Sequence, residues 1–285
     1  MVCTYRDFTV FLGLARTFGI RFTLGNIQKQ QTTDDSSSRV AAPFLSVVVL
    51  AYNEEGNLSS QVSAVLSWFD ELKASDYACC PDLLEHRTGP FGEFGELIIV
   101  NDGSTDDTGD VADALGKSDA RVRVVHHESN KGMGATVRTG YAAATGCFVT
   151  QLPGDGQVGP KTLERFLPHL ADVDMVLSVY EEREDGAHRK FLSAGFQTMV
   201  RLMFRHDPRI NGTMIVRREL VEKTPTKTST FVANLELPFR LMDRGVEHRV
   251  VEITAIPRQR GQSKVTNVRR ILRVAGELIR LRIRG

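Results

Sequence analysis

The chain has 285 residues, of which 41% are hydrophobic and 25% are charged, as is ordinary for a soluble globular protein with one large or two small domains. The net charge of +1 produces no overall positive field, so a nucleic-acid partner is not expected. The positive charge is concentrated at the C-terminal end, where residues 258–284 hold nine Lys or Arg residues and one acid, Glu277.

The cysteines and the hydropathy pattern predict where the protein resides. Cys3, Cys79, Cys80 and Cys147 have no paired metal spacing and do not resemble a disulfide framework, which favours a reduced, cytoplasmic chain. No run of about 18 uncharged apolar residues predicts a membrane-spanning helix. The expected localisation is therefore cytoplasmic, and the protein could lie peripherally on the cytoplasmic face of a membrane.

Residues 1–43 are expected to form an N-terminal extension and linker. Residues 8–24 are apolar but interrupted by Arg16 and Arg21, which fits a surface-lying amphipathic helix or a disordered lead-in equally well. Residues 25–43 are polar and rich in Ser, Thr and Gln, as is typical of a linker. The domain proper is expected from residue 44 to residue 264.

A regular alternation of strands and helices follows. The Val-rich run 44–50 predicts a buried strand, residues 54–73 have helical spacing, and the glycine- and proline-containing residues 75–95 predict a surface insertion. Further strands are expected at 96–101, 121–126, 147–152 and 173–179, with helices at 106–116, 131–144 and 160–171. Strands alternating with helices predict βαβ units, and therefore an α/β fold whose mostly parallel sheet carries helices on both faces.

After residue 180 the alternation changes, and this half is expected to supply the acceptor side of a cleft. It predicts helices near 188–204 and 232–244, strands near 213–216 and 246–253, and a polar loop at 223–229. The last segment, 265–285, predicts a basic amphipathic helix with apolar residues at helical spacing. This helix could lie on an anionic membrane surface, or its apolar stripe could pack on the domain with solvated arginines.

Polar residues follow the first two strands of this pattern. Tyr52, Asn53 and Glu54 come after the first strand, and Asp102 closes the second. Ligands bind at the carboxyl ends of strands in an open parallel sheet, where Asp102 could accept a hydrogen bond from a base ring N–H. The alternative for Glu54 is electrostatic, since a carboxylate is favoured at the start of a helix.

Two later segments could contact a diphosphate. Gly132 and Gly134 allow close approach of the backbone to a ligand, and Lys131 could face a phosphate, although this is not a Walker loop. Asp155, with Gln157 two residues later, could hold Mg²⁺ or Mn²⁺, because these ions bind one or two carboxylates together with substrate phosphate oxygens. By itself the glycine-containing segment is a weak signal, and the segment around Asp155, taken singly, is better explained as a turn.

Together these segments resemble a family 2 glycosyltransferase of the dolichyl-phosphate mannose synthase type, over roughly residues 44–270. The order of the motifs carries the resemblance more than any one motif does. The matching positions are Tyr52-Asn53-Glu54, Asn101-Asp102-Gly103-Ser104, Asn130 with Gly132 and Gly134, Asp155 with Gln157, Arg189 with Ser193, Glu236 with Gly245, and Arg258 with Gly261, Ser263 and Lys264. The chain departs from the family at Pro153, which replaces the first acid of an Asp-x-Asp motif, and at Tyr180 and Met214, where basic residues are common.

The resemblance implies a GT-A type nucleotide-sugar-binding fold and an inverting hexosyltransferase. The donor would be a GDP- or UDP-sugar, the cofactor Mg²⁺ or Mn²⁺ on Asp155 and Gln157, and the acceptor a polyprenyl phosphate. Asp155, Glu236 and Arg189 are the expected catalytic residues, with Glu236 as general base if the acceptor is a hydroxyl. The expected substrate-binding residues are Leu50, Tyr52, Glu54, Asp102, Lys131, Gly132, Gln157, Arg258, Ser263 and Lys264.

Two other hypotheses remain open at this point. One is a soluble glycosyltransferase acting on a glycan or a small-molecule hydroxyl. The other follows from Pro153: a protein that keeps the nucleotide pocket, has lost catalysis, and serves as a nucleotide-sugar-binding subunit.

Overall fold

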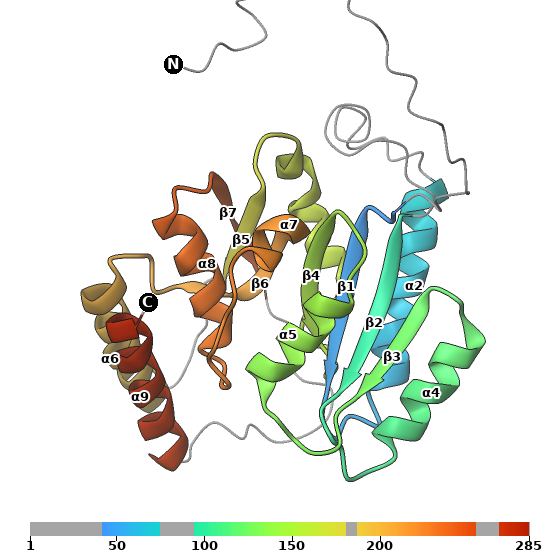
Figure 1. Ribbon diagram of the computed structural model, residues 1–285, viewed down its shortest axis with the longest axis horizontal. Coiled ribbons are helices and arrows are strands. Elements are labelled where there is room, and N and C mark those ends of the chain that lie inside the picture. The colour runs from blue at the N-terminus through green and yellow to red at the C-terminus, as the bar shows by residue number, and fades with distance from the viewer. Residues whose placement is uncertain (1–41, 75–93, 181–186, 255–267, 285) are drawn as a thin grey trace, which may run out of the picture. The chain divides into compact units, whose positions relative to one another are not determined.

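The computed structural model describes residues 42–74, 94–180, 187–254 and 268–284, all within the compact unit Val40–Gly285. Seven strands form one sheet (Figure 1). They are β1 (Leu45–Ala51), β2 (Gly95–Asn101), β3 (Val122–His126), β4 (Phe148–Pro153), β5 (Met175–Tyr180), β6 (Ile210–Arg217) and β7 (His248–Ile253). The helices are α2 (Leu58–Ala74), α4 (Thr108–Ser118), α5 (Met133–Ala143), α6 (Ala187–Phe204), α7 (Arg218–Glu222), α8 (Ala233–Asp243) and α9 (Val268–Arg284).

The sheet has the strand order β3-β2-β1-β4-β6-β5-β7. β1 pairs in parallel with β2 and β4, β2 with β3, and β5 with β7, whereas β6 runs antiparallel to both β4 and β5. The predicted mostly parallel sheet is therefore confirmed. The strand order reverses beside β1, and the carboxyl ends of β1 and β2 lie at the lower edge of the sheet in Figure 1.

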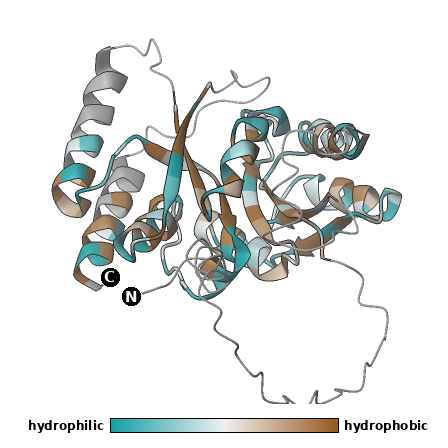
Figure 2. Cartoon of the chain, turned by 90° about the horizontal axis from the view of Figure 1, so that it is seen from above, coloured by the Kyte–Doolittle hydropathy of each residue, from teal (hydrophilic) through white to brown (hydrophobic). Residues whose placement is uncertain are grey.

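Two hydrophobic cores cover the two faces of the sheet. Along β1, Val47 and Val49 face the core formed with α2 and α4, while Val48 faces the core formed with α5, α8 and α9. Because successive strand residues point to opposite faces, the uninterrupted Val run fits a strand buried on both sides. Figure 2 shows the apolar residues, in brown, along much of the sheet. The prediction of helices on both faces is confirmed.

The one predicted helix with a different conformation is 160–171. It consists of two short 3-10 helices, η1 (Pro160–Arg165) and η2 (Leu167–Ala171). Pro168 lies in the middle of the predicted helix and has no N–H to donate, so it interrupts an α-helical hydrogen-bond ladder. The short helix α7 and the longer extent of β6 were also not predicted. No helix in the described ranges is long and apolar enough to cross a membrane.

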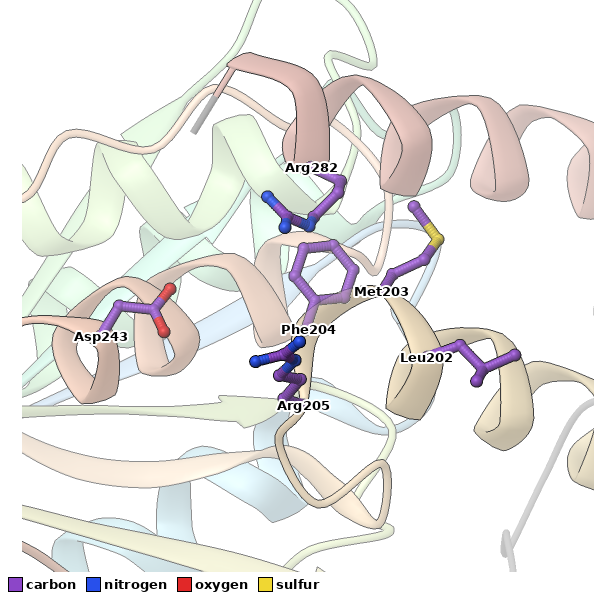
Figure 3. A pocket seen from close by; sticks show the side chains of 6 residues that line it. All are labelled: Leu202, Met203, Phe204, Arg205, Asp243 and Arg282. Atoms are coloured by element: carbon purple, nitrogen blue, oxygen red, sulfur yellow. The ribbon is translucent and has the colours of Figure 1, made fainter.

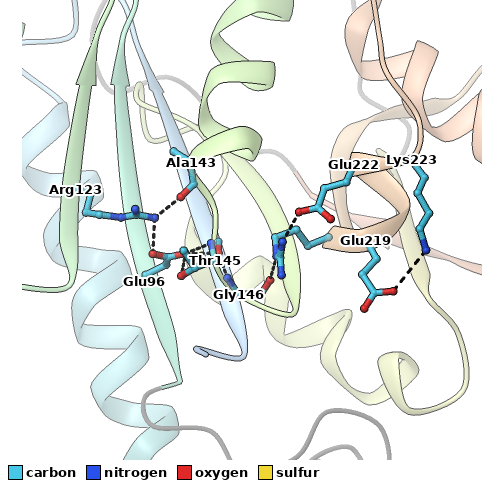
Figure 4. A network of polar contacts seen from close by, with 10 residues as sticks. Glu96, Arg123, Ala143, Thr145, Gly146, Glu219, Glu222 and Lys223 are labelled. Atoms are coloured by element: carbon cyan, nitrogen blue, oxygen red, sulfur yellow. Dashed lines mark hydrogen bonds and ion pairs between the residues drawn. The ribbon is translucent and has the colours of Figure 1, made fainter. Parts of the chain in front are cut away.

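Glu96 ties the amino ends of β1, β2 and β4 together, at the edge opposite the polar strand ends (Figure 4). Its carboxylate accepts hydrogen bonds from Ser46 Oγ at 2.6 Å and from the Thr145 backbone N–H at 2.6 Å, and it pairs with Arg123 at 2.8 Å. Burial by itself raises the pKa of Glu96, but the bonds from Ser46 and Thr145 and the Arg123 charge hold the pKa below its ordinary value of 4.5.

Substitution of Glu96 by Gln is expected to lower the free energy of unfolding by about 1 kcal/mol near neutral pH, because the buried Ser46 hydroxyl and the more exposed Thr145 and Arg123 lose a charged acceptor. The folded-state pKa is depressed, so this contribution is present above the unfolded pKa and is lost as the pH falls through the folded pKa. Urea unfolding at about pH 7 and about pH 4 should show the difference from wild type narrowing in acid. Glu128→Gln, at an exposed position, is the matched control; an equal loss there would contradict the prediction.

Candidate active site

The predicted polar residues meet where the strand order reverses, at the carboxyl ends of β1, β2 and β4. The ends of β1 and β4 are in close contact: Leu50 pairs with Pro153, and the Gly154 N–H donates to the Leu50 carbonyl at 2.9 Å. A Cβ on Gly154 would lie 2.8 Å from that carbonyl oxygen, so only glycine allows this approach. The turn that follows carries Asp155.

Asp102 anchors the glycine-containing loop 130–134. Its buried carboxylate accepts the backbone N–H of Lys131 at 2.8 Å and that of Gly132 at 2.9 Å, and His127 Nδ1 lies 2.7 Å from the oxygen that Lys131 contacts. A carboxylate only accepts, so His127 Nδ1 carries the proton. These three bonds leave one of the roughly four acceptor positions of the carboxylate open. Asp102 therefore shapes the loop and can still accept one bond from a ligand.

His127 is a member of the site that the motifs did not indicate. It lies directly after β3, is 8% exposed, and its second ring nitrogen lies 2.9 Å from Thr139 Oγ1 on α5. The neighbouring residue Asn101 is fixed by a hydrogen bond of its own. Its amide nitrogen lies 3.0 Å from His126 Nδ1, while His126 Nε2 bonds to Asp113 at 2.9 Å. An aspartate at position 101 has no N–H for that bond.

Hydrogen bonds join the loop after β1 to the loop after β2. Asn53 has a positive φ of 54°; its backbone N–H donates to Ser104 Oγ at 3.0 Å, and its side-chain oxygen accepts the Thr105 N–H at 2.9 Å. The Glu54 N–H donates to Thr108 Oγ1 at 2.8 Å, and the Glu54 carboxylate accepts from Asn57 at 2.8 Å. This arrangement fixes the backbone around Tyr52, whose side chain is 38% exposed.

Asp155 follows β4 in a tight turn. Its side chain is 9% exposed, its Oδ1 accepts the backbone N–H of Gln157 at 3.1 Å, and Gly156 between them has a positive φ of 73°. The sequence left open whether this segment is a turn or a ligand site. The turn is present, and it places a carboxylate just after the point where β4 contacts the end of β1.

The glycine-containing loop packs directly on the segment 227–230. The Gly134 N–H donates to the Ser229 carbonyl at 3.1 Å, and Arg138 Nη1 donates to the Thr228 carbonyl at 2.7 Å. Gly132 has a φ of 86° and a ψ of 162°, a conformation that is essentially restricted to glycine. The half of the chain after residue 180 is thereby placed against the half that carries Asp102.

Gly134→Ala is expected to disrupt this contact. A Cβ at position 134 would lie 2.1 Å from the Thr228 carbonyl oxygen, and the neighbour is backbone that cannot rotate away. Overpacking of this kind typically costs 1–3 kcal/mol. Urea unfolding should report that loss. Gly195→Ala on α6, where nothing lies within 4 Å, is the control; equal stability of the two variants would show that the loops can separate without cost.

Glu236 lies in the first turn of α8 with its carboxylate fully buried and fully engaged. It accepts the Lys227 N–H at 3.0 Å, the Thr228 N–H at 2.8 Å and the Thr228 hydroxyl at 2.6 Å, and it pairs with Arg240 at 3.0 Å. These contacts hold the segment 227–228 in place. The role of Glu236 as a general base stays a prediction, and its surroundings are those of a residue that positions a loop.

Glu277 of α9 holds the next two residues of the same segment. Its carboxylate accepts from Ser229 Oγ at 2.8 Å and from Thr230 Oγ1 at 2.6 Å. Burial by itself raises the pKa of Glu277, but the bonds from Thr230 and Ser229 outweigh it and keep the pKa below its ordinary value. The sequence showed only that Glu277 is the one acid in a basic segment; its function in the fold required the tertiary contact.

The remaining predicted residues are only partly placed. Lys131 is exposed, and within the described ranges its ammonium group has no hydrogen bond or ion pair. Arg189 belongs to the first turn of α6. Arg258, Ser263 and Lys264 lie outside the described residues. Met214, on β6, is buried at 2% exposure in the core.

Known proteins resemble this chain in sequence. Residues 46–225 match the family model described as Glycosyl transferase family 2. The chain is 27% identical over 242 residues to polyprenol monophosphomannose synthase of Mycolicibacterium smegmatis, covering 77% of this chain and 80% of that protein. It is 30% identical over 152 residues to undecaprenyl-phosphate 4-deoxy-4-formamido-L-arabinose transferase of Pseudomonas aeruginosa, covering 53% of this chain and 39% of that protein. Three other bacterial glycosyltransferases are matched over only 20–29% of their length.

Solved structures resemble it in fold. A complex of glucosyl-3-phosphoglycerate synthase from Mycobacterium tuberculosis with Mn²⁺, UDP and phosphoglyceric acid has a TM-score of 0.59 and 20% identity, covering 83% of this chain and 78% of that chain. This likeness confirms the predicted GT-A fold. Because the family model matches more than half of the chain, this protein belongs to glycosyl transferase family 2.

Proposed function

We propose that this protein is a glycosyltransferase that transfers a sugar from a nucleotide-sugar donor to a polyprenyl phosphate, with inversion at the anomeric carbon. The acceptor oxygen attacks that carbon in line and forms the new glycosidic bond, while the bond to the nucleoside diphosphate breaks and the diphosphate leaves with the electron pair. The main barrier is the charge that develops on the leaving diphosphate. The residues of the site are proposed to bind the donor, the metal or the acceptor.

Asp102 and Lys131 support a nucleotide donor. The open acceptor position of Asp102 would receive a base N–H, and the exposed Lys131 would approach the diphosphate. Tyr52 would contact the nucleoside, with Glu54 and Leu50 beside it. The complex of glucosyl-3-phosphoglycerate synthase contains UDP, which supports a uridine donor, whereas the mannose synthase relative leaves a GDP-sugar equally open.

Asp155 supports a divalent metal that is shared with the donor. In the described ranges no group of three or more His, Cys, Asp and Glu side chains could hold an ion. One carboxylate together with substrate phosphate oxygens is, however, a common way to bind Mg²⁺ or Mn²⁺. When bound, the metal supplies positive charge against the leaving diphosphate. Gln157, whose backbone orients Asp155, is proposed to assist.

The engagement of Glu236 is the observation that favours a phosphate acceptor. A hydroxyl acceptor requires a general base, and the predicted base is 0% exposed with its oxygens occupied by Lys227, Thr228 and Arg240. A phosphate monoester, with a second pKa of about 6, is already largely ionised near neutral pH and needs no base. Arg189 and the basic residues Arg258 and Lys264 are proposed to bind it.

The exposed apolar residues near the site suit a lipid-linked acceptor. Met133, in the glycine-containing loop, is 40% exposed and Phe231, after Thr230, is 41% exposed. They flank the contact between the loop 130–134 and the segment 227–230. The names of two relatives, a polyprenol monophosphomannose synthase and an undecaprenyl-phosphate transferase, support the same acceptor class.

Product partitioning tests this function. The chain is incubated with undecaprenyl phosphate, Mg²⁺ or Mn²⁺, and radiolabelled GDP- or UDP-sugars, and the mixture is extracted with organic solvent. Label in the organic phase is the expected result. Label transferred only to water-soluble acceptors would overturn the lipid acceptor. Nucleotide-dependent thermal stabilisation without any transfer would instead favour a binding protein.

A further inference from the structure

Helix α9 has two apolar faces that differ in environment. Val274, Leu278 and Leu281 are at most 8% exposed and pack into the core shared with α5 and α8. Ile279 and Ile283, one turn apart, are 49% and 77% exposed. The sequence left two alternatives for α9, packing on the domain or contact with a membrane surface, and each can apply to a different face of the helix. One stripe packs on the domain, and a second apolar pair has no partner among the described residues.

The end of α6 extends this exposed apolar surface. Leu202 on α6 is 78% exposed, and Leu202 and Arg282 of α9 line the same pocket. The exposed Leu202 of α6 and the exposed Arg282 of α9 therefore border one pocket, and Ile279 and Ile283 are exposed on the same helix as Arg282.

The pocket between these elements contains two arginines without partners. It has a volume of about 390 Å³ and is lined by Leu202, Met203, Phe204, Arg205, Asp243 and Arg282. Figure 3 shows the Phe204 ring between the side chains of Arg205 and Arg282. Neither guanidinium group forms a hydrogen bond or ion pair within the part of the chain that the structure describes, whereas Asp243 is engaged with His206 at 2.8 Å.

The charge of α9 is strongly positive. The helix contains six Arg residues and one Glu, and that Glu277 is turned to the segment 229–230 and bonded there. Arg280 and Arg282 are exposed beside the outward-facing Ile279 and Ile283. Arginines next to exposed apolar side chains fit a surface whose outer layer is anionic and whose interior is apolar.

We propose that the α6–α9 surface docks on a bilayer containing anionic phospholipids. Phosphates of lipid headgroups bind Arg205 and Arg282, which line the pocket on either side of the Phe204 ring, and Leu202, Ile279 and Ile283 insert at the boundary between headgroups and acyl chains. The site is distinct from the donor site. It requires neither donor nor polyprenyl phosphate, so it goes beyond the proposed transfer reaction and can be tested without it.

The test is co-sedimentation of the full chain with vesicles that contain no polyprenyl phosphate. Phosphatidylcholine vesicles are compared with vesicles of phosphatidylcholine and phosphatidylglycerol. We expect binding to the anionic vesicles only. Because each basic residue near an anionic surface contributes about 1 kcal/mol, Arg205→Gln with Arg282→Gln should weaken binding on the order of 30-fold. Leu202→Ser with Ile283→Ser should also weaken binding, since both positions are exposed.

A charge-matched control separates this surface from a general effect of positive charge. Lys117→Gln with Arg249→Gln removes two exposed charges from α4 and β7. If the control and the Arg205/Arg282 variant lose vesicle binding equally, the pocket has no specific role in binding. If the Arg205/Arg282 variant and the Leu202/Ile283 variant both bind vesicles like wild type, another part of the chain binds the membrane. Absence of binding to any vesicle would overturn the docking surface, leaving a protein partner as its occupant. Transfer to a water-soluble short-chain prenyl phosphate, measured separately, reports on the proposed function alone.

Discussion

Glu236→Ala is expected to lower the free energy of unfolding by about 3–5 kcal/mol, the typical cost of removing one partner of a buried ion pair. The substitution leaves Arg240 without its carboxylate and removes the acceptor for the Lys227 and Thr228 N–H groups. Those residues hold the segment against which Gly134 packs, so donor binding should weaken as well. Urea unfolding and nucleotide-dependent thermal shifts measure the two effects.

The alternative role of Glu236 makes a different prediction. A general base could be replaced by Gln with little loss of stability, a large fall in kcat and the loss of one limb of the pH–rate profile. The expected result is the opposite: Glu236→Gln should destabilise the protein, because the Gln amide nitrogen would face backbone N–H donors. Glu247→Ala, at an exposed position beyond the end of α8, is the control and should leave stability near that of wild type.

Asp155→Asn is expected to lower the rate of transfer by about 10²–10³-fold, the cost seen when one group that stabilises transition-state charge is removed. The Asn oxygen can still accept the Gln157 N–H, so the turn after β4 and the stability should be retained. Initial rates over a range of Mg²⁺ and Mn²⁺ concentrations measure the effect. In the variant the transfer rate should fall and should also depend less on the metal concentration. Asp172→Asn, an exposed position, is the control. Transfer at the wild-type rate by Asp155→Asn would remove Asp155 from the proposed metal site.

Local patterns accounted for most of the fold. The alternation of Val-rich runs with helical spacing predicted β1 to β5 and α2 to α6, because burial on two faces or on one helical stripe is already encoded over a few residues. The predicted helix at 160–171 was wrong because a weak apolar pattern was given more weight than Pro168. The reversal of β6 was not indicated, since strand direction depends on tertiary packing.

The sequence predicted where the site residues lie better than it predicted which residues they contact. Motif order brought Tyr52, Asp102 and Asp155 to one edge of the sheet, where the structure also places them. The partners of Asp102 include His127, and the segment 227–230 is held by Glu236 and Glu277. These bonds join distant parts of the chain and have no local signature, so a single sequence offered no way to find them.

The path of contacts from Asp102 to α9 has a consequence for how the protein acquires its site during synthesis. Asp102 and Lys131 are 29 residues apart, Arg138 and Thr228 are 90 apart, and Ser229 and Glu277 are 48 apart. The last of these bonds needs Glu277 of α9, which follows all four strands β1 to β4 in the chain. Contacts of long sequence separation form late. A nascent chain therefore completes the proposed donor-binding edge of the sheet only after α9 has been made and has packed on the segment 229–230.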